Sequence, residues 1–222
     1  MDVAARLIGI FAITYVIGAL PTAVIASRLV AGIDVRELGT RNPGAANIFR
    51  EVDPRVGVIV AIIDISKALI PVLIVDRALN LGPSGATTAA LGALWGHQFS
   101  VFLRFRGGAG LAPAMGGVAG LMLGPTLLAA IVGLPMLLLT RNMGWTGGVT
   151  MGVAFVITGL LVWTDVPFPA VARVEAAGYL YGGALISLLL ALHFWRRRLG
   201  ELRAARGADA ACDAASTTEG QK

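Results

Sequence analysis

The segment Leu7–Ser27, LIGIFAITYVIGALPTAVIAS, is a run of 21 residues without a charged side chain. A helix needs about 20 apolar residues to cross the hydrocarbon core of a bilayer. The run is too long for the apolar core of a signal peptide, Asp2 lies near its start, and a polar loop and more apolar runs follow it. It therefore predicts a retained membrane-spanning helix.

Similar runs recur through the chain, which has 222 residues, 56% of them hydrophobic and 14% charged, and a mean hydropathy of +0.78. This composition excludes an ordinary soluble domain. Six more apolar segments are candidate spans: Val56–Val75, Ala86–Leu103, Leu111–Leu123, Pro125–Thr140, Met143–Trp163 and Ala176–Trp195. The sequence thus predicts an all-α, polytopic integral membrane protein with about seven transmembrane helices.

The stretch 111–140 admits two interpretations. It is either one long bent helix or two short helices that turn at Gly124-Pro125, because proline disfavours helix in the residue before it. With the break, only Arg6, Arg77 and Arg173 lie on the side opposite the other arginines. Positive loops face the cytoplasm. We therefore expect seven spans, an external N-terminus and a cytoplasmic C-terminus, with arginines 28, 36, 41, 50, 55, 104, 106, 141, 196, 197, 198, 203 and 206 on the cytoplasmic side.

The chain predicts one transmembrane domain, residues 1–200, and a disordered cytoplasmic tail, residues 201–222, that is small, polar and mixed in charge. The single cysteine, Cys212, lies in this tail, so we expect no internal disulfide, no metal site and no cofactor. The pI near 10.1 suggests contact with anionic headgroups or substrates. Nucleic-acid binding is not expected, because no folded domain outside the membrane could carry it.

The loop Gly39–Arg50, GTRNPGAANIFR, lies between the first two apolar segments. It holds two amides (Asn42 and Asn47), two arginines (Arg41 and Arg50) and the hydroxyl of Thr40. Such a density of donors at a membrane surface suits an anion such as phosphate. The alternative is a solvated loop whose arginines only orient the helices.

Two further groups lie within the predicted spans. Asp64 and Lys67 are three residues apart and share a helix face. Charges inside a bilayer usually pair and face the bundle interior, so the pair either orients the helix or contacts substrate. His97, in the third span, is more typical of an interhelical hydrogen-bonding group than of a catalyst.

Two basic features flank the later spans. Arg104–Gly110, RFRGGAG, precedes the fourth apolar segment. Its glycines allow backbone N–H groups to approach a ligand near a helix start, so it predicts a phosphate cradle. His193 lies near the end of the last span, before three arginines. All these groups converge on one membrane face, which indicates an interfacial site for a soluble phosphate compound and a lipid-like acyl donor.

These residues resemble the acyl-phosphate-dependent glycerol-3-phosphate acyltransferases, the PlsY family. Gly39–Arg50 is similar to that family's G-S-G-N-x-G-A-T-N-V-x-R loop, and Gly18–Pro21 to its first-helix G-S-x-P. Asp64–Lys67 resembles its D-x-x-K-G motif, and Gly96–Gly110 its G-H-x-x-P-x-F-x-x-F-K-G-G-K-G motif. The resemblance is dense from about residue 14 to 113 and thins beyond.

The resemblance implies seven spans in a bacterial inner (plasma) membrane and transfer of an acyl group from acyl phosphate to the 1-hydroxyl of glycerol 3-phosphate. The product is lysophosphatidic acid. Membrane lipid and an enzyme that produces acyl phosphate are the implied partners. The implied catalytic residues are His193, Asn42 and Arg50. The implied phosphate-binding residues are Thr40, Asn47, Gly107, Gly108 and Gly110, with Asp64, Lys67 and His97 as supporting residues. We expect Arg41, Arg106 and Arg141 to add positive charge for phosphate on the same membrane face.

The chain departs from the family pattern at several positions. Ala109 stands where the family's glycine loop has lysine, and Arg196 where it has asparagine. Arg41, where the family usually has glycine, and Arg141 are extra cations that either restore the missing charge or suit a different anion. The alternative function is a non-catalytic relative that binds lipid phosphates or scaffolds membrane enzymes. A transporter is disfavoured, because the polar groups crowd one surface and no inverted repeat is visible.

Overall fold

The structure is a computed structural model that describes residues 2–164, 177–196 and 199. Helices and loops make up this part of the chain, with no strand in it, which confirms the all-α prediction. The α-helices are α1 (Val3–Ala19), α2 (Thr22–Ala31), α3 (Ala45–Glu51), α4 (Pro54–Leu73), α5 (Gly82–Gln98), α6 (Leu111–Leu121), α7 (Leu123–Thr140), α8 (Met143–Thr164) and the final helix (Ala177–Arg196). Two 3₁₀ turns, η1 (Val35–Glu37) and η3 (Val101–Leu103), and a π-helix, η2 (Ile74–Ala78), complete the set.

Five helical segments in this part are long and apolar enough to cross a membrane: Val3–Ala31, Pro54–Ala78, Leu123–Thr140, Met143–Thr164 and Ala177–Arg196. The protein is therefore a polytopic membrane protein. α5 has 17 residues and α6 has 11, so both are shorter than a usual span. The count of seven spans stays a prediction, and the predicted tail, residues 201–222, lies outside the described residues.

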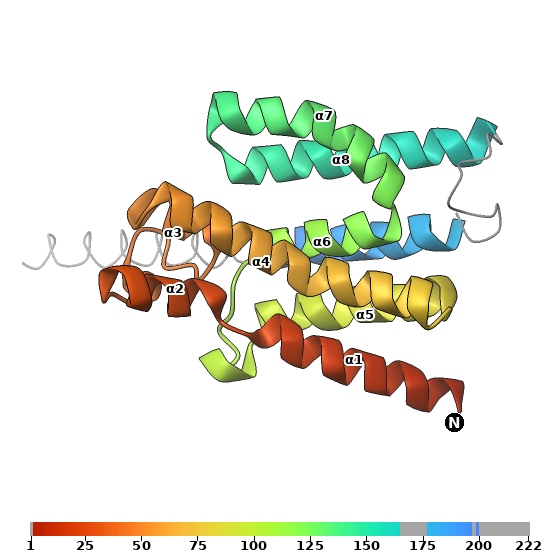
Figure 1. Ribbon diagram of the computed structural model, residues 1–222, viewed down its shortest axis with the longest axis horizontal. Helices are drawn as coiled ribbons and strands as arrows, with labels where there is room; N and C mark the ends of the chain where they lie inside the picture. The colour runs from red at the N-terminus through yellow and green to blue at the C-terminus, as the bar shows by residue number, and fades with distance from the viewer. Residues whose placement is uncertain (1, 165–176, 197–198, 200–222) are drawn as a thin grey trace, which may run out of the picture.

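The long helices run side by side with their axes roughly aligned (Figure 1). α1 packs against α5, α4 against α6, and α7 against α8. Small residues permit the closest of these contacts: a Cβ added to Gly92 would lie 2.1 Å from Thr14 Oγ1, and one added to Gly96 would lie 2.0 Å from the Tyr15 carbonyl oxygen. Helices in membranes associate through such close backbone approaches.

The first apolar segment is not one continuous helix, contrary to our expectation. α1 ends at Ala19 and α2 begins at Thr22, with Leu20 and Pro21 between them. Pro21 is the reason, because it disfavours helix at Leu20 and cannot donate to the preceding turn. The break leaves the Leu20 carbonyl free to accept a hydrogen bond from the Lys67 ammonium.

The predicted break within 111–140 is confirmed, but it lies at Met122, which ends α6 and precedes α7. Pro125 falls in the first turn of α7, where its missing N–H removes no intrahelical bond. The chain reverses at this point, so α7 returns alongside α8 (Figure 1).

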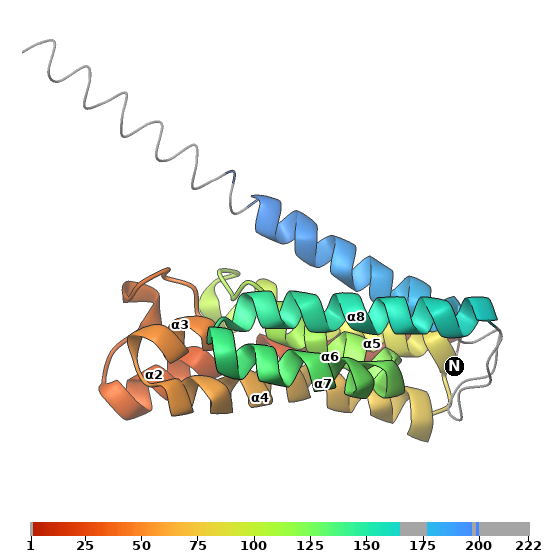
Figure 2. The ribbon, with the colours of Figure 1, turned by 90° about the horizontal axis from the view of Figure 1, so that it is seen from above.

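A second apolar core supports the loop end of the bundle. Val35 of η1 and Ile48 of α3 are fully buried there, with Val24 of α2, Val60 of α4 and Leu103 of η3. This cluster fixes the Gly39–Arg50 loop on the ends of α2 and α4. Figure 2 shows that the final helix starts beside α8 and diverges from the bundle toward its own end.

The loops that carry the predicted site lie at one end of the bundle, and the N-terminus lies at the other (Figure 1). We predict that this loop end faces the cytoplasm. In a Cys212→Ser background, cysteines at Asn42, Arg104 and Arg141 should resist an impermeant thiol reagent in intact cells, whereas a cysteine at Asn80 should react. Labelling of the first three from outside would contradict the predicted orientation.

Candidate active site

Asn47 holds the first loop in shape. Its side-chain N–H groups donate to the carbonyls of Val35 and Leu38, each at 3.0 Å, and its Oδ1 accepts from the Thr40 backbone N–H and hydroxyl at 3.2 and 3.1 Å. Asn47 is fully buried. Its amide is therefore occupied within the loop, and the predicted direct contact between Asn47 and phosphate does not fit this arrangement.

Asp34 anchors the start of the same loop. Its carboxylate accepts from Arg36 at 2.6 Å and from Arg28 at 2.8 Å, and also from the backbone N–H of Arg36 at 3.0 Å. The side-chain hydrogen bond from Arg36 holds the pKa of Asp34 well below its usual range, and the same contact raises the pKa of Arg36. Asp34 therefore stays ionised at neutral pH and keeps Arg36 in place.

The glycine-rich loop packs directly on the end of α5. The N–H groups of Gly107 and Gly108 donate to the carbonyls of Gln98 and His97, each at 3.0 Å. A Cβ on Gly107 would lie 2.0 Å from the His97 carbonyl oxygen, and one on Gly108 would lie 2.2 Å from His97 Nε2. These two glycines therefore allow close packing, and their N–H groups donate within the protein, so a contact of these groups with phosphate stays a prediction.

The next residues leave donors available. Gly110 has φ +90°, a conformation that favours glycine, and precedes α6. The N–H groups of Ala109 and Gly110 donate to no group among the described residues, although the Ala109 carbonyl accepts from Gln98 Nε2 at 3.2 Å. The start of α6 adds the positive end of a helix dipole, so an anion would be favoured here.

A polar cavity of about 540 Å³ joins the first loop, the glycine-rich loop and the final helix. It brings together three of the sequence-predicted side chains, Arg41, Arg106 and His193, with Gly107. The other lining residues are Asp34, Arg36, Glu37, Pro43, Gln98, Phe99 and Phe105. Sequence reasoning missed these, although Asp34 and Arg36 belong to the same basic stretch as the loop.

The cavity has an excess of positive charge. Arg36 is paired with Asp34, whereas Arg41 and Arg106 make no ion pair with any described residue. Arg41 also has φ +56°, an uncommon conformation for a residue with a side chain. Two arginines without a carboxylate partner beside open backbone N–H groups favour an anionic ligand such as phosphate.

Other predicted site residues lie outside the walls of this cavity. Thr40 and Asn42 belong to the loop behind it, and Gly108 lies beneath it on His97. Arg50 is exposed on α3 without a hydrogen bond or ion pair to any described residue, and Arg141 is exposed at the end of α7. The proposed contacts of Asn42, Arg50 and Arg141 with substrate therefore stay predictions.

His193 enters the cavity from the final helix. Its ring meets Phe99 edge to face, with ring centroids 5.9 Å apart and an interplanar angle of 84°. Phe99 is itself fixed, because its carbonyl accepts from the Tyr15 hydroxyl at 2.6 Å. The packing orients an imidazole toward the same space as Arg41 and Arg106.

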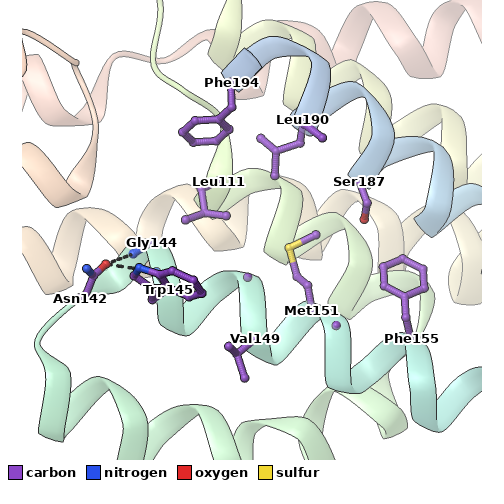
Figure 3. A pocket seen from close by; sticks show the side chains of 13 residues that line it. Leu111, Asn142, Gly144, Trp145, Val149, Met151, Phe155, Ser187, Leu190 and Phe194 are labelled. Atoms are coloured by element: carbon purple, nitrogen blue, oxygen red, sulfur yellow. Dashed lines mark hydrogen bonds between the residues drawn. The ribbon is translucent and has the colours of Figure 1, made fainter. Parts of the chain in front are cut away.

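A second, apolar cavity of about 860 Å³ lies between α8 and the final helix. Figure 3 shows Trp145, Val149, Met151 and Phe155 along α8 on one side, with Leu190 and Phe194 of the final helix on the other. We call it the apolar groove. Its remaining lining residues are Leu111, Asn142, Gly144, Gly148, Gly152, Ser187 and Ala191.

The apolar groove has the length of a lipid chain in one leaflet. Gly144 lies near one end and Phe155 at the other, which along α8 corresponds to roughly 16 Å. One leaflet occupies about half of the roughly 30 Å hydrocarbon core. Gly148 and Gly152 open the wall, because a Cβ on either would meet no atom within 4 Å.

The two cavities are lined by residues that are close neighbours in the chain, and we call this region the junction. His193 lines the polar cavity and Phe194 lines the apolar groove. Gly107 lines the first and Leu111 the second. Ala109 and Gly110, whose N–H groups donate to no described residue, lie between them in the chain. A ligand with an anionic head and an apolar chain would therefore pass this junction.

The fold and the two cavities define a helical membrane protein with a basic pocket at one end of its bundle and a lipid-sized groove beside it. The family described as glycerol-3-phosphate acyltransferase matches this chain over residues 8–204. The chain therefore belongs to that family.

Curated relatives agree with this assignment. A glycerol-3-phosphate acyltransferase of Aromatoleum aromaticum is 35% identical over 170 residues, which cover 69% of this chain and 86% of the relative. One from Syntrophotalea carbinolica is 41% identical over 102 residues, and this match spans only 52% of the relative's length. A crystal structure of PlsY, an integral membrane glycerol 3-phosphate acyltransferase, in its glycerol 3-phosphate form is similar with a TM-score of 0.68 and 26% identity, covering 90% of this chain and 92% of that one.

Proposed function

We propose that this protein transfers a fatty acyl group from acyl phosphate to the 1-hydroxyl of glycerol 3-phosphate at the cytoplasmic face of a bacterial inner membrane. The observation that carries the proposal is that neighbouring residues, His193 and Phe194, line the basic cavity and the apolar groove, as do Gly107 and Leu111. Both substrates carry a phosphate, and only the donor carries a long chain. The junction matches that combination.

The acyl donor would lie across the junction. Its chain occupies the apolar groove, and its phosphate lies against the open N–H groups of Ala109 and Gly110 at the start of α6. Its carbonyl carbon then falls near His193. An acyl phosphate is already activated, so the protein needs only to position it and stabilise the charge that develops on the carbonyl oxygen.

Glycerol 3-phosphate would enter the polar cavity from the aqueous side. Arg41 and Arg106 hold its phosphate, and His193 accepts the proton of the 1-hydroxyl as that oxygen attacks the acyl carbon. The bond between the acyl carbon and the phosphate oxygen breaks. Lysophosphatidic acid and inorganic phosphate leave, and the proton passes from His193 to the departing phosphate or to water.

A non-catalytic relative that binds lipid phosphates is the second candidate. Ala109 favours it, because the family's lysine is absent from the glycine-rich loop. The deciding assay supplies purified protein with glycerol 3-phosphate and acyl phosphate, with acyl-CoA in parallel, and measures lysophosphatidic acid. Product from acyl phosphate supports the acyltransferase. Binding of glycerol 3-phosphate without product from either donor supports the alternative.

An enzyme that makes acyl phosphate is the proposed partner in the cell. Its product is anionic at one end and apolar at the other, so it would reach this protein within the bilayer surface. The exposed apolar wall of the groove provides the entry.

The groove predicts a chain-length effect for Gly148→Leu. The new side chain fills the groove wall, where a Cβ meets no neighbour within 4 Å, so the protein still folds. Loss of contact with three or four methylenes at about 0.8 kcal/mol each corresponds to roughly 60- to 200-fold in kcat/KM for a long-chain donor. Short-chain donors should be affected much less.

Gly159→Leu provides the matched control. Gly159 lies on the same helix and also has nothing within 4 Å of an added Cβ, but it does not line the groove. It should leave the preference for chain length unchanged. Equal effects of both variants on all donors would remove the groove from the acyl site.

A further inference from the structure

A buried polar cluster lies beneath the glycine-rich loop. Lys67 of α4 donates to Asp64 Oδ1 at 2.9 Å, to Thr22 Oγ1 at 3.0 Å and to the Leu20 carbonyl. Asp64 Oδ1 also accepts from the Thr22 hydroxyl at 2.5 Å. The side chains of Asp64 and Lys67 are 1% and 5% exposed. The cluster therefore ties α4 to the break between α1 and α2.

One acceptor atom of the cluster has no hydrogen-bond donor among the described residues. Asp64 Oδ2 is buried and accepts no hydrogen bond from the described residues. A carboxylate oxygen without a partner in such a place is costly, so most structures satisfy it. The nearest ionisable neighbour across the helix interface is His97, whose Nδ1 lies 3.9 Å from Asp64 Oδ1. That distance is too long for a hydrogen bond but within reach of a small rotation.

The other side of His97 faces the loop. Its Nε2 lies so close to Gly108 that a Cβ there would be 2.2 Å away, and its carbonyl accepts from the Gly108 N–H at 3.0 Å. Arg106 and Gly107, immediately before Gly108, line the polar cavity. A shift of the imidazole would therefore move the wall of the cavity.

We propose that Asp64, held by Lys67 and Thr22, is a positioning residue that fixes the His97 ring and thereby sets the Arg106–Gly108 wall of the anion cavity. This deepens the proposed function, on which it rests. Asp64 and His97 themselves touch no substrate. They determine where the Arg106 guanidinium lies, and so how tightly glycerol 3-phosphate binds.

The double variant Asp64→Asn/Lys67→Met separates positioning from support of the fold. Removing both charges leaves no uncompensated ion, and such paired replacements are often tolerated. We expect a protein with nearly unchanged thermal stability, a KM for glycerol 3-phosphate raised about tenfold or more, and a smaller change in kcat, since misplacement of a binding group weakens substrate positioning. Thr158→Val, which removes a buried hydroxyl of α8 far from the loop, is the control and should leave KM unchanged.

His97 gives an independent test. His97→Asn keeps a side-chain N–H near the position of Nδ1, so it should retain most of the parental KM, whereas His97→Leu should raise KM as the double variant does. A parental KM in the double variant and in His97→Leu would overturn the proposal. So would a double variant that no longer folds, because the pair would then support the whole bundle. A parent protein without activity would instead refute the acyltransferase function itself.

Discussion

Arg41→Ala should lower kcat/KM for glycerol 3-phosphate about a hundredfold, or roughly 2.7 kcal/mol, which is the lower range for loss of one donor at a charge-stabilising site. The reason is the position of Arg41 in the polar cavity, where it has no carboxylate partner among the described residues. Steady-state assays of folded, detergent-solubilised variants measure the effect. Arg55→Ala, at an exposed position on the first turn of α4, is the matched control for loss of one cation and should change the rate little.

Arg41→Gly sharpens this test. Arg41 has φ +56°, a conformation that costs about 1 kcal/mol or more for a residue with a Cβ but little for glycine. The variant should therefore be as stable as the parent or more stable, while its activity falls as in Arg41→Ala. Stability and activity would then change in opposite directions. A parental rate in Arg41→Gly would show that the side chain takes no part in catalysis.

The glycine-rich loop lacks the family's lysine, so placing a lysine there can test whether lost activity is restored. Ala109→Lys in the Arg41→Ala background should recover part of the lost activity, because it returns a cation beside the open N–H groups at the start of α6. If the parent shows no turnover and Ala109→Lys creates it, the chain is a decayed relative.

Arg141→Ala should lower the activity less than Arg41→Ala does, since Arg141 lies outside the cavity.

His193→Gln should lower kcat by about 10²- to 10⁴-fold, the range for loss of a general base, and change the KM for glycerol 3-phosphate much less. The imidazole lines the polar cavity beside the junction with the groove, and its edge-to-face contact with Phe99 orients it. Glutamine keeps hydrogen-bonding groups but cannot accept the proton effectively. Product formation under saturating substrates gives kcat directly.

Leu192→Ala is the control for His193, because it changes the neighbouring residue on the same helix without touching either cavity. It should retain the parental kcat. A His193→Gln protein with parental kcat would remove the histidine from the reaction. A raised KM with unchanged kcat would indicate instead that His193 only binds substrate.

Apolar run lengths and proline positions predicted much of the helical order. The break was predicted at Gly124-Pro125 but lies at Met122, between the end of α6 at Leu121 and the start of α7 at Leu123, because proline is tolerated in a first helical turn. Pro21 likewise indicated a helix break within the first apolar run. We predicted one continuous helix there because the run is long enough to cross a membrane. The count of seven spans stays a prediction, because α5 and α6 are short and owe their burial to neighbouring helices.

The sequence predicted that several basic residues would lie close together, but it did not reveal how the loops around them pack. Arg41, Arg106 and His193 line one cavity, as their shared membrane face suggested. The contact of Gly107 and Gly108 with the end of α5 could not be predicted, because it depends on tertiary packing that no local pattern reveals. Asn47 is similar, since its four hydrogen bonds arise only when the loop closes on η1.

The final helix diverges outward from α8, so the apolar groove between them is open to the bilayer. Lipid chains therefore form part of the groove's wall. Trp145 and Phe194 are 68% and 43% exposed beside the groove, so a chain can slide in sideways and never needs to leave the lipid phase. Surfactant tails have the same access. Alkyl detergents should therefore act as competitive inhibitors whose potency grows with tail length until the tail reaches Phe155.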